Sequence, residues 1–388
     1  MTRIITVVSA LAVIMVSAIT IAFTRPSVIG NVAMTGIMGL IVSVLVSVPC
    51  AVMLSRWMIR IGVAWSRVIS CVLVLLWGVP WVLVIGSISP SDDQLSLMVA
   101  ATHLTDGELT PSGSNYSTGV YMERYPYQSG PVLLIWEFMR ITGLRGYAAY
   151  HILQILGVVL MAITVIIIGW CAGLMASSRA ESCSLAIMGL YAPIGMFGFK
   201  VYGNIMAMPL MALTMGMCVL CVHERCWFHT IGLMLSCAFM VALKLNTMIL
   251  VIAVVIILMM DSIRNRSWGR TIPMIGVIIA AIMGVTAPVM AFGRITGLNM
   301  TGNRQPTISW LATGITSSRD GGSGPYNPDV LEYPQYSTMK VTYDRGRITF
   351  DKAVAGFVND PSSIVGFLTS MLIFLWAGPS SGLSDSPA

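Results

Sequence analysis

Residues 146–170 read GYAAYHILQILGVVLMAITVIIIGW, a run without a single lysine, arginine, aspartate or glutamate. About 20 apolar residues in a helix cross the hydrocarbon of a bilayer, so this stretch predicts a membrane-spanning helix. The whole chain of 388 residues has this character, because 56% of it is apolar, 10% is charged and its mean hydropathy is +0.83. A soluble domain carries about 25% charged residues. We therefore expect an all-α polytopic membrane protein, with lipid as its main solvent.

Other apolar runs of similar length add further spans. The run that follows Arg3 resembles a signal peptide, but it is long and lacks a small-residue cleavage site, so we interpret it as a retained helix. Stretch 228–260 is one over-long helix or two short ones, and a break near Lys244 is preferred because a lysine in mid-membrane is costly. The predicted set has about ten spans: 4–23, 28–54, 68–88, 146–170, 183–199, 204–222, 228–243, 246–260, 271–292 and 363–377.

The orientation follows from the lysines and arginines of the short loops, which accumulate on the cytoplasmic side. A cytoplasmic N-terminus places most of them inside, and we expect a multi-pass protein of the cell membrane (plasma or inner membrane). Two long polar stretches, 89–130 and 293–361, then lie outside. They indicate that the functional site is on the external face. The expected parts are an N-terminal helical hairpin (1–67), a transmembrane core with the first outer loop (68–292), a second outer loop (293–361), and a last helix with its tail (362–388).

Three shorter helices are expected in these regions. Segment 131–142 is apolar but too short to span and carries two charges, which favours an interfacial or re-entrant helix. Residues 93–105 have helical character with Ser91 as a plausible N-cap. Segment 343–358 is predicted to be an amphipathic helix on the membrane surface.

Two acidic residues, Asp92 and Asp93, lie at the start of the first outer loop, where a helix leaves the membrane. They either only cap the next helix, whose dipole favours acids in its first turn, or supply a general base for an acceptor hydroxyl. Farther along, the stretch YMERYPYQSGP (121–131) is more polar than an aromatic interface belt requires. Its Arg124, together with Arg140 and Arg145, has the guanidinium chemistry that suits a phosphate or pyrophosphate.

In their order and spacing, these segments resemble the GT-C glycosyltransferases, whose members include dolichyl-phosphate-mannose protein mannosyltransferases and bacterial lipid A aminoarabinose transferases. SDDQ (91–94) and ERYPYQSG (123–130) look like the "SDQ … YP-x-Q-x-G" pattern of one bacterial branch. KVYGN (200–204) looks like a Tyr-rich step between two helices, and LKLNTMI (243–249) like a Lys-bearing break. PTISWLATGI (306–315) with GPYNPD (324–329) resembles a late outer-loop pattern.

The resemblance implies an activity. Enzymes of this superfamily move a sugar from a polyprenyl-phosphate carrier to an acceptor at the outer face, with inversion and one outer-loop aspartate as base. Asp93 is then the general base and Asp92 its reserve. The other residues that the resemblance implies contact the donor: Arg124, Lys244, Lys200 and Arg145 at the carrier phosphate, and Tyr125, Gln128 and Tyr202 around the sugar.

The expected partners are membrane lipid, the polyprenyl-phosphate-linked sugar, and an envelope polymer, glycolipid or protein as acceptor, with no nucleic acid. No P-loop, dinucleotide fingerprint or zinc-protease motif occurs, which disfavours a soluble nucleotide-sugar donor. No resident metal site is expected, although a divalent metal stays open as a cofactor. Two other interpretations stay open. The first is a transporter or flippase of lipid-linked sugars, which an ionisable residue at a helix break, Lys244, would favour. The second is a non-catalytic subunit of envelope assembly.

Overall fold

The computed structural model forms two compact units, one of residues Ser47–Arg304 and one that combines Met1–Val46 with Gln305–Ala388. All regular elements among the described residues are helices. In the second unit, α14 (Thr307–Ile315) packs against α16 (Met339–Asn359). The structure describes residues 48–85, 90, 92–109, 116–224, 226–266, 271–302, 304–315 and 339–368.

Five helices of the described residues are long and apolar enough to cross a membrane, which confirms a helical multi-pass protein. A sixth, α11 (Trp227–Leu243), is apolar but only 17 residues long. Each of the five coincides with a span predicted from hydropathy. They are α3 (Val63–Ile85), α7 (Gly146–Met175), α10 (Gly203–His223), α12 (Met248–Asn265) with the short turn before it, and α13 (Thr271–Thr296).

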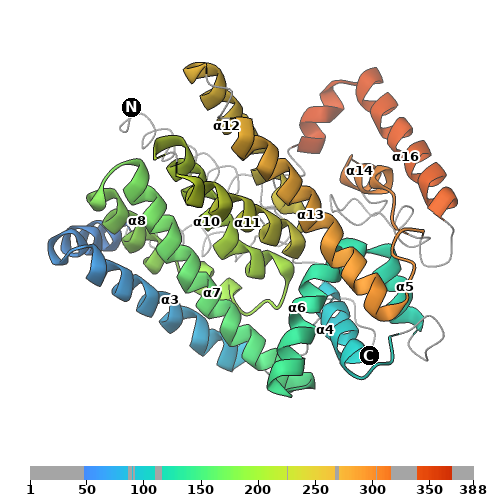
Figure 1. Cartoon of the computed structure of the whole chain (residues 1–388), viewed down its shortest axis with the longest axis horizontal. Coiled ribbons are helices and arrows are strands. Elements are labelled where there is room, and N and C mark those ends of the chain that lie inside the picture. The colour runs from blue at the N-terminus through green and yellow to red at the C-terminus, as the bar shows by residue number, and fades with distance from the viewer. Residues whose placement is uncertain are drawn as a thin grey trace, which may run out of the picture. The chain divides into compact units, whose positions relative to one another are not determined.

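The long helices pack in a row in which α3 contacts α7, α7 contacts α10, α10 contacts α11, and α11 contacts α13 (Figure 1). Four short helices lie across one set of ends of these long helices: α4 (Asp92–Thr105), α5 (Tyr116–Arg124), η2 (Pro126–Gln128) and α6 (Ser129–Thr142). Among them, α6 is the central element, because it contacts α4, α10, α11 and α13. The described part of stretch 89–130 is therefore a folded helical layer.

At the opposite ends of the long helices, an ion pair and a hydrogen bond from a hydroxyl connect α3 to α8 (Ser178–Leu190). Nη2 of Arg67 lies 2.6 Å from Oε1 of Glu181, whose side chain is only 8% exposed. One turn farther along α3, the Ser70 hydroxyl donates to the carbonyl of Leu185 at 2.8 Å. Interhelical polar contacts of this kind hold apolar helices together in lipid, where burial of apolar surface gives no driving force.

The predicted span 183–199 is wrong as one helix. The structure has two, α8 and the short α9 (Ala192–Phe197), with Tyr191 between them at φ −78° and ψ 82°. Pro193 explains the interruption, because it has no N–H to continue the hydrogen-bond ladder and it is tolerated only in the first turn of a helix. The break redirects the chain, so that the KVYGN step arrives beside α4.

The predicted break near Lys244 is confirmed. Helix α11 ends at Leu243, Lys244 is extended (φ −153°, ψ 113°), and a 3-10 turn, η3 (Leu245–Thr247), leads into α12. Two polar groups satisfy the freed carbonyl of Lys244: the Thr247 amide at 3.1 Å and the Thr247 hydroxyl at 2.7 Å.

The short helices predicted at 93–105, 131–142 and 343–358 are confirmed as α4, α6 and α16. Of the other predictions, span 4–23 and Ser91 lie outside the described residues, as do most of spans 28–54 and 363–377.

Two glycines let other helices approach the end of α11 closely. A Cβ at Gly130, in the first turn of α6, would collide with the carbonyl oxygen of Ala242, and a Cβ at Gly203, the first residue of α10, with that of Leu243. The N-termini of α6 and α10 thus face the C-terminus of α11, an arrangement that the helix dipoles favour. This contact is what brings three distant segments of sequence to one place.

Replacement of Gly130 by alanine tests this packing. Because the added methyl group meets backbone that cannot move aside easily, we expect a loss of about 1–3 kcal/mol of stability. The matched control is Gly356→Ala in α16, where a Cβ has open space and alanine is the better helix former. Thermal unfolding in detergent measures both; an unchanged melting temperature for Gly130→Ala would contradict the close approach.

Candidate functional site

Asp93 lies in the first turn of α4, exposed, with two tyrosine hydroxyls on its carboxylate. Tyr202 donates to Oδ2 at 2.7 Å, and Tyr121 donates to Oδ1 at 3.3 Å. Each carboxylate oxygen has two lone pairs, so both oxygens keep the capacity to accept a further proton or hydrogen bond. The candidate base is thus held in place and still open to a substrate.

Tyr202 is held against α4 by the residue that follows Asp93. The Gln94 side-chain oxygen accepts a hydrogen bond from the backbone N–H of Val201 at 3.0 Å and another from the Tyr150 hydroxyl at 3.4 Å. Val201 is buried, and Tyr202 is the N-cap residue of α10. Gln94 therefore fixes the KVYGN step to the start of α4 and aims the tyrosine at the carboxylate.

Lys244 brings a cation to the same hydroxyl. Its Nζ donates to the Tyr202 oxygen at 2.8 Å and lies 4.0 Å from the centre of that ring. Burial lowers the pKa of Lys244, and the nearby Asp93 carboxylate partly offsets this. The Gln128 amide, only 2% exposed, also donates to Tyr202, at 3.3 Å. Asp93, Gln128, Tyr202 and Lys244, predicted from four separate segments, therefore lie in one cluster.

Three further tyrosines surround this cluster. The ring of Tyr125 lies 4.8 Å from that of Tyr121 and 6.1 Å from that of Tyr127, centre to centre. Burial, with the charge of Asp93 as a smaller cause, raises the pKa of both Tyr121 and Tyr127 above the ordinary 10.0. The same causes raise the pKa of Tyr202. The neutral phenols make an aromatic wall beside the carboxylate.

Arg124 is a buried guanidinium, only 8% exposed, in the last turn of α5. Its Nε has no hydrogen-bond partner within the part of the chain that the structure describes. Burial lowers its pKa, and the group that opposes this effect is the Tyr125 hydroxyl, not a carboxylate. A buried cation without an acidic partner is costly, so this position is suited to an anion.

The loop after α13 fixes α5 in place. The backbone N–H of Asn299 donates to Oε1 of Glu123 at 2.9 Å, and Leu298 packs against Gly119. Glu123 therefore anchors the helix that carries Tyr121 and Arg124.

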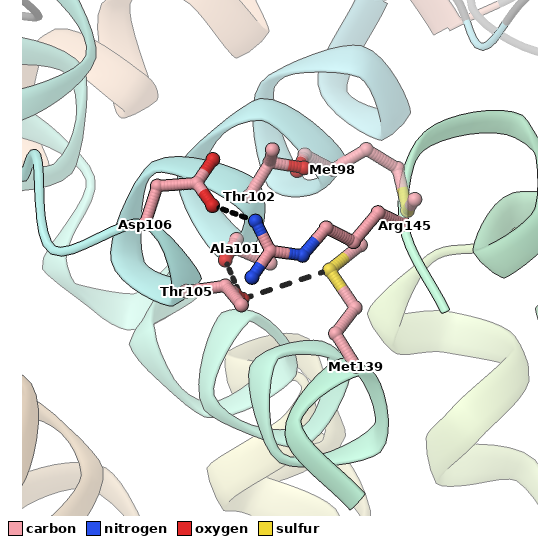
Figure 2. A network of polar contacts seen from close by, with 7 residues as sticks. All are labelled: Met98, Ala101, Thr102, Thr105, Asp106, Met139 and Arg145. Atoms are coloured by element: carbon pink, nitrogen blue, oxygen red, sulfur yellow. Dashed lines mark hydrogen bonds and ion pairs between the residues drawn. The ribbon is translucent and has the colours of Figure 1, made fainter. Parts of the chain in front are cut away.

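The structure does not bring Arg145 to the cluster. Figure 2 shows its guanidinium directed at Asp106, with which it forms an ion pair. Beside this pair, the Thr105 hydroxyl contacts the carbonyl of Ala101 and the sulfur of Met139 (Figure 2). Asp106 follows the last residue of α4, about 20 Å along the helix from Asp93 at 1.5 Å per residue. Arg145 thus stabilises the far end of α4.

Two other predicted residues also lie apart from the carboxylate contacts. Lys200 is exposed, and its Nζ lies over the ring of Phe197 at 5.6 Å. Asp92 begins α4, but its side chain lies outside the described part of the structure. No group of three or more His, Cys, Asp or Glu suited to a metal ion occurs among the described residues.

Sequence reasoning missed three residues of the site. From the sequence, Tyr121 and Tyr127 are only aromatic residues of the YMERYPYQSGP stretch, and Gln94 is only part of a motif. The spacing of Tyr121 and Tyr125 is a usable signal, because residues four apart share one face of a helix. Tyr125 directly follows α5, and its backbone N–H still bonds to the carbonyl of Tyr121 at 2.9 Å.

The tyrosine wall predicts a late alkaline titration. Because Tyr121, Tyr127 and Tyr202 have raised pKa values in the folded state, they should stay neutral when the pH first exceeds 10. Their contribution to stability is complete below pH 10 and is lost as the pH rises through the folded-state values. Ultraviolet absorbance of tyrosinate against pH checks this, with Tyr121→Phe expected to remove only late-titrating signal. Early loss of signal in that variant would show that Tyr121 titrates normally.

No model of a known protein family, no curated protein and no solved structure matches this chain, so the geometry of the cluster carries the functional argument.

Proposed function

We propose that the protein is an integral-membrane glycosyltransferase that moves a sugar from a polyprenyl-phosphate carrier to an acceptor of the cell envelope. The observation that carries this proposal is the pairing of a carboxylate and an ammonium group through one tyrosine hydroxyl, Asp93–Tyr202–Lys244. Transfer from a glycosyl phosphate needs both: a base for the acceptor hydroxyl and a cation for the phosphate that leaves.

In the proposed reaction, Asp93 accepts the proton of the acceptor hydroxyl as its oxygen attacks the anomeric carbon from the face opposite the phosphate. The bond from that carbon to the phosphate oxygen breaks, and its electron pair stays on the carrier phosphate. Lys244 has two N–H groups left after its bond to Tyr202, and they are available to this anion. Arg124 offers a second cation, whose buried Nε is unused within the described residues.

A carrier with a long apolar chain also needs lipid access. A small apolar hollow beside the cluster is lined by residues of η2, α6, α11, η3 and α13, with Tyr127 and Leu245 among them. It adjoins the Lys244 break, but its free space holds about one water molecule, so in the proposal the carrier's chain lies in the surrounding lipid and not in this hollow.

The outer face is the proposed location of the reaction. Helices α7, α10 and α12 all begin beside the Asp93 cluster, near Tyr150, Tyr202 and Lys244, and run away from it. Arg179, Arg264 and Arg266 therefore lie at the far ends of these helices, as does Arg67, which pairs with Glu181. Basic residues in short loops favour the cytoplasmic side. The acceptor is then an envelope polymer, a glycolipid or a protein.

One observation favours a second candidate, a transporter or flippase of lipid-linked sugars. The break between α11 and α12 carries a half-buried lysine, and transporters commonly bind substrates at broken helices. Such a protein moves its substrate without chemical change.

The decisive test is Asp93→Asn in a transfer assay with a polyprenyl-phosphate sugar and membrane acceptors. Loss of the base should reduce transfer about 100-fold or more with normal membrane insertion. Asp106→Asn is the matched control, because it removes the same kind of acid from the other end of α4 and should retain transfer. Full activity of Asp93→Asn would remove the base assignment, whereas movement of unaltered donor across vesicles would favour the flippase.

A binding experiment tests Arg124 separately. Arg124→Gln should weaken the affinity for a short polyprenyl phosphate about tenfold or more, since a hydrogen bond to a charged group is lost. Arg140→Gln is the control, because this exposed arginine pairs with Glu137 and faces no substrate in the proposal. Equal affinities of the two variants would exclude Arg124 from the phosphate site.

A further inference from the structure

The hydroxyl of Tyr202 has all its hydrogen-bonding positions occupied. A phenol offers one proton and two lone pairs. Two neighbours act as donors to its oxygen: the ammonium group of Lys244 at 2.8 Å and the amide of Gln128 at 3.3 Å. Since the ammonium group has no lone pair to accept a proton, the Tyr202 proton has one direction left. It points to Oδ2 of Asp93, at 2.7 Å.

The direction of these hydrogen bonds lets the ammonium group polarise the Tyr202 hydroxyl. A donor with a positive charge pulls electron density from the phenol oxygen and makes its O–H a stronger donor, because linked hydrogen bonds polarise one another. The strengthened O–H stabilises the negative charge of Asp93. The cation at residue 244 therefore acts on the carboxylate through the tyrosine as well as directly through space.

We propose that Tyr202 is a positioning residue that couples the anion site at Lys244 to the general base at Asp93. This rests on the proposed function and adds an order of events to it. With the anion site empty, Lys244 polarises Tyr202, and Tyr202 holds the Asp93 charge. When the donor phosphate takes the ammonium group, the polarisation falls and Asp93 becomes a stronger base. The base is thus activated only once the sugar donor is bound.

The surroundings of the hydroxyl bear on any pH effect. The titratable groups that face it are Asp93 from α4, Tyr121 from α5, Tyr127 from η2 and Lys244 itself. The three phenols have raised pKa values, so they are neutral where the enzyme would work. Near neutral pH the coupling thus concerns the carboxylate and the ammonium group.

A double-mutant cycle on the titration of Lys244 tests the coupling without any transfer reaction. The chain has four lysines (Lys200, Lys244, Lys340 and Lys352), so NMR of the intact protein in nanodiscs with ¹³C-labelled lysine gives few side-chain Cε signals, and Lys244→Arg identifies the one needed. Asp93→Asn should lower the Lys244 pKa, because a neighbouring negative charge is removed. In the Tyr202→Phe background, this decrease should shrink about twofold or more.

Tyr121→Phe is the matched control. It removes the other tyrosine hydroxyl from Asp93, the one at 3.3 Å, while Lys244 keeps its bond to Tyr202. The effect of Asp93→Asn on the Lys244 pKa should therefore stay full in this background. Equal effects of Asp93→Asn with and without the Tyr202 hydroxyl would overturn the proposal, as would an equal reduction in the Tyr121→Phe background.

A second measurement uses transfer activity. In Tyr202→Phe the carboxylate loses a donated hydrogen bond that stabilises its ionised form, so the acid limb of the pH–rate profile should move to higher pH. A purely structural role would lower the rate at every pH and leave the limb in place, which would contradict the proposal. The two failures are distinguishable: a wild-type protein without transfer activity disproves the proposed function, whereas additive Lys244 titrations disprove the coupling.

Discussion

A helix can be interrupted at membrane depth only where the freed backbone groups are buried in protein or meet water, because lipid offers them no hydrogen bonds. The interruption at Lys244 depends on this constraint. Thr247 satisfies the carbonyl of Lys244, and the glycine-bearing starts of α6 and α10 cover the end of α11. Because those two helix starts must come this close, the residues just before them, Gln128 and Tyr202, meet at the break. The cluster is thus a consequence of how one turn is protected.

The cations that pair with acids and those without a carboxylate partner lie in different parts of the structure. At one end of the helix row, Arg67 and Glu181 form a pair that ties α3 to α8. At the other end, Lys244 and Arg124 have no carboxylate partner in direct contact among the described residues, and the hydrogen bonds that link Lys244 to Asp93 pass through a tyrosine. Ion pairs whose charges satisfy each other stabilise packing, whereas cations held without such a partner are available to a ligand. Arg145 belongs to the first class, since Asp106 takes its charge.

The sequence predicted much of this, but unevenly. The apolar runs of α3, α7, α10, α12 and α13 were long enough to be recognised without any contact information. The break at Lys244 was predictable because burying a charged side chain within a membrane-spanning helix costs free energy. Hydropathy does not reveal the interruption at Tyr191, because the run 183–199 stays apolar on both sides of Pro193. Tyr121 was missed because its role depends on α4, a partner that lies 28 residues earlier in the chain.

Composition and periodicity by themselves showed that the protein lies in a lipid bilayer, that its fold is helical and that polar segments lie at the helix ends. Those properties depend on local chemistry summed along the chain, which a sequence displays directly. Only the tertiary structure decided which charges meet. Arg124, Arg145, Lys200 and Lys244 are alike in charge, and their sequence neighbours do not distinguish them. Whether a cation faces an acid, an aromatic ring or a hydroxyl depends on contacts between segments far apart in the chain, and these exist only after the helices have packed.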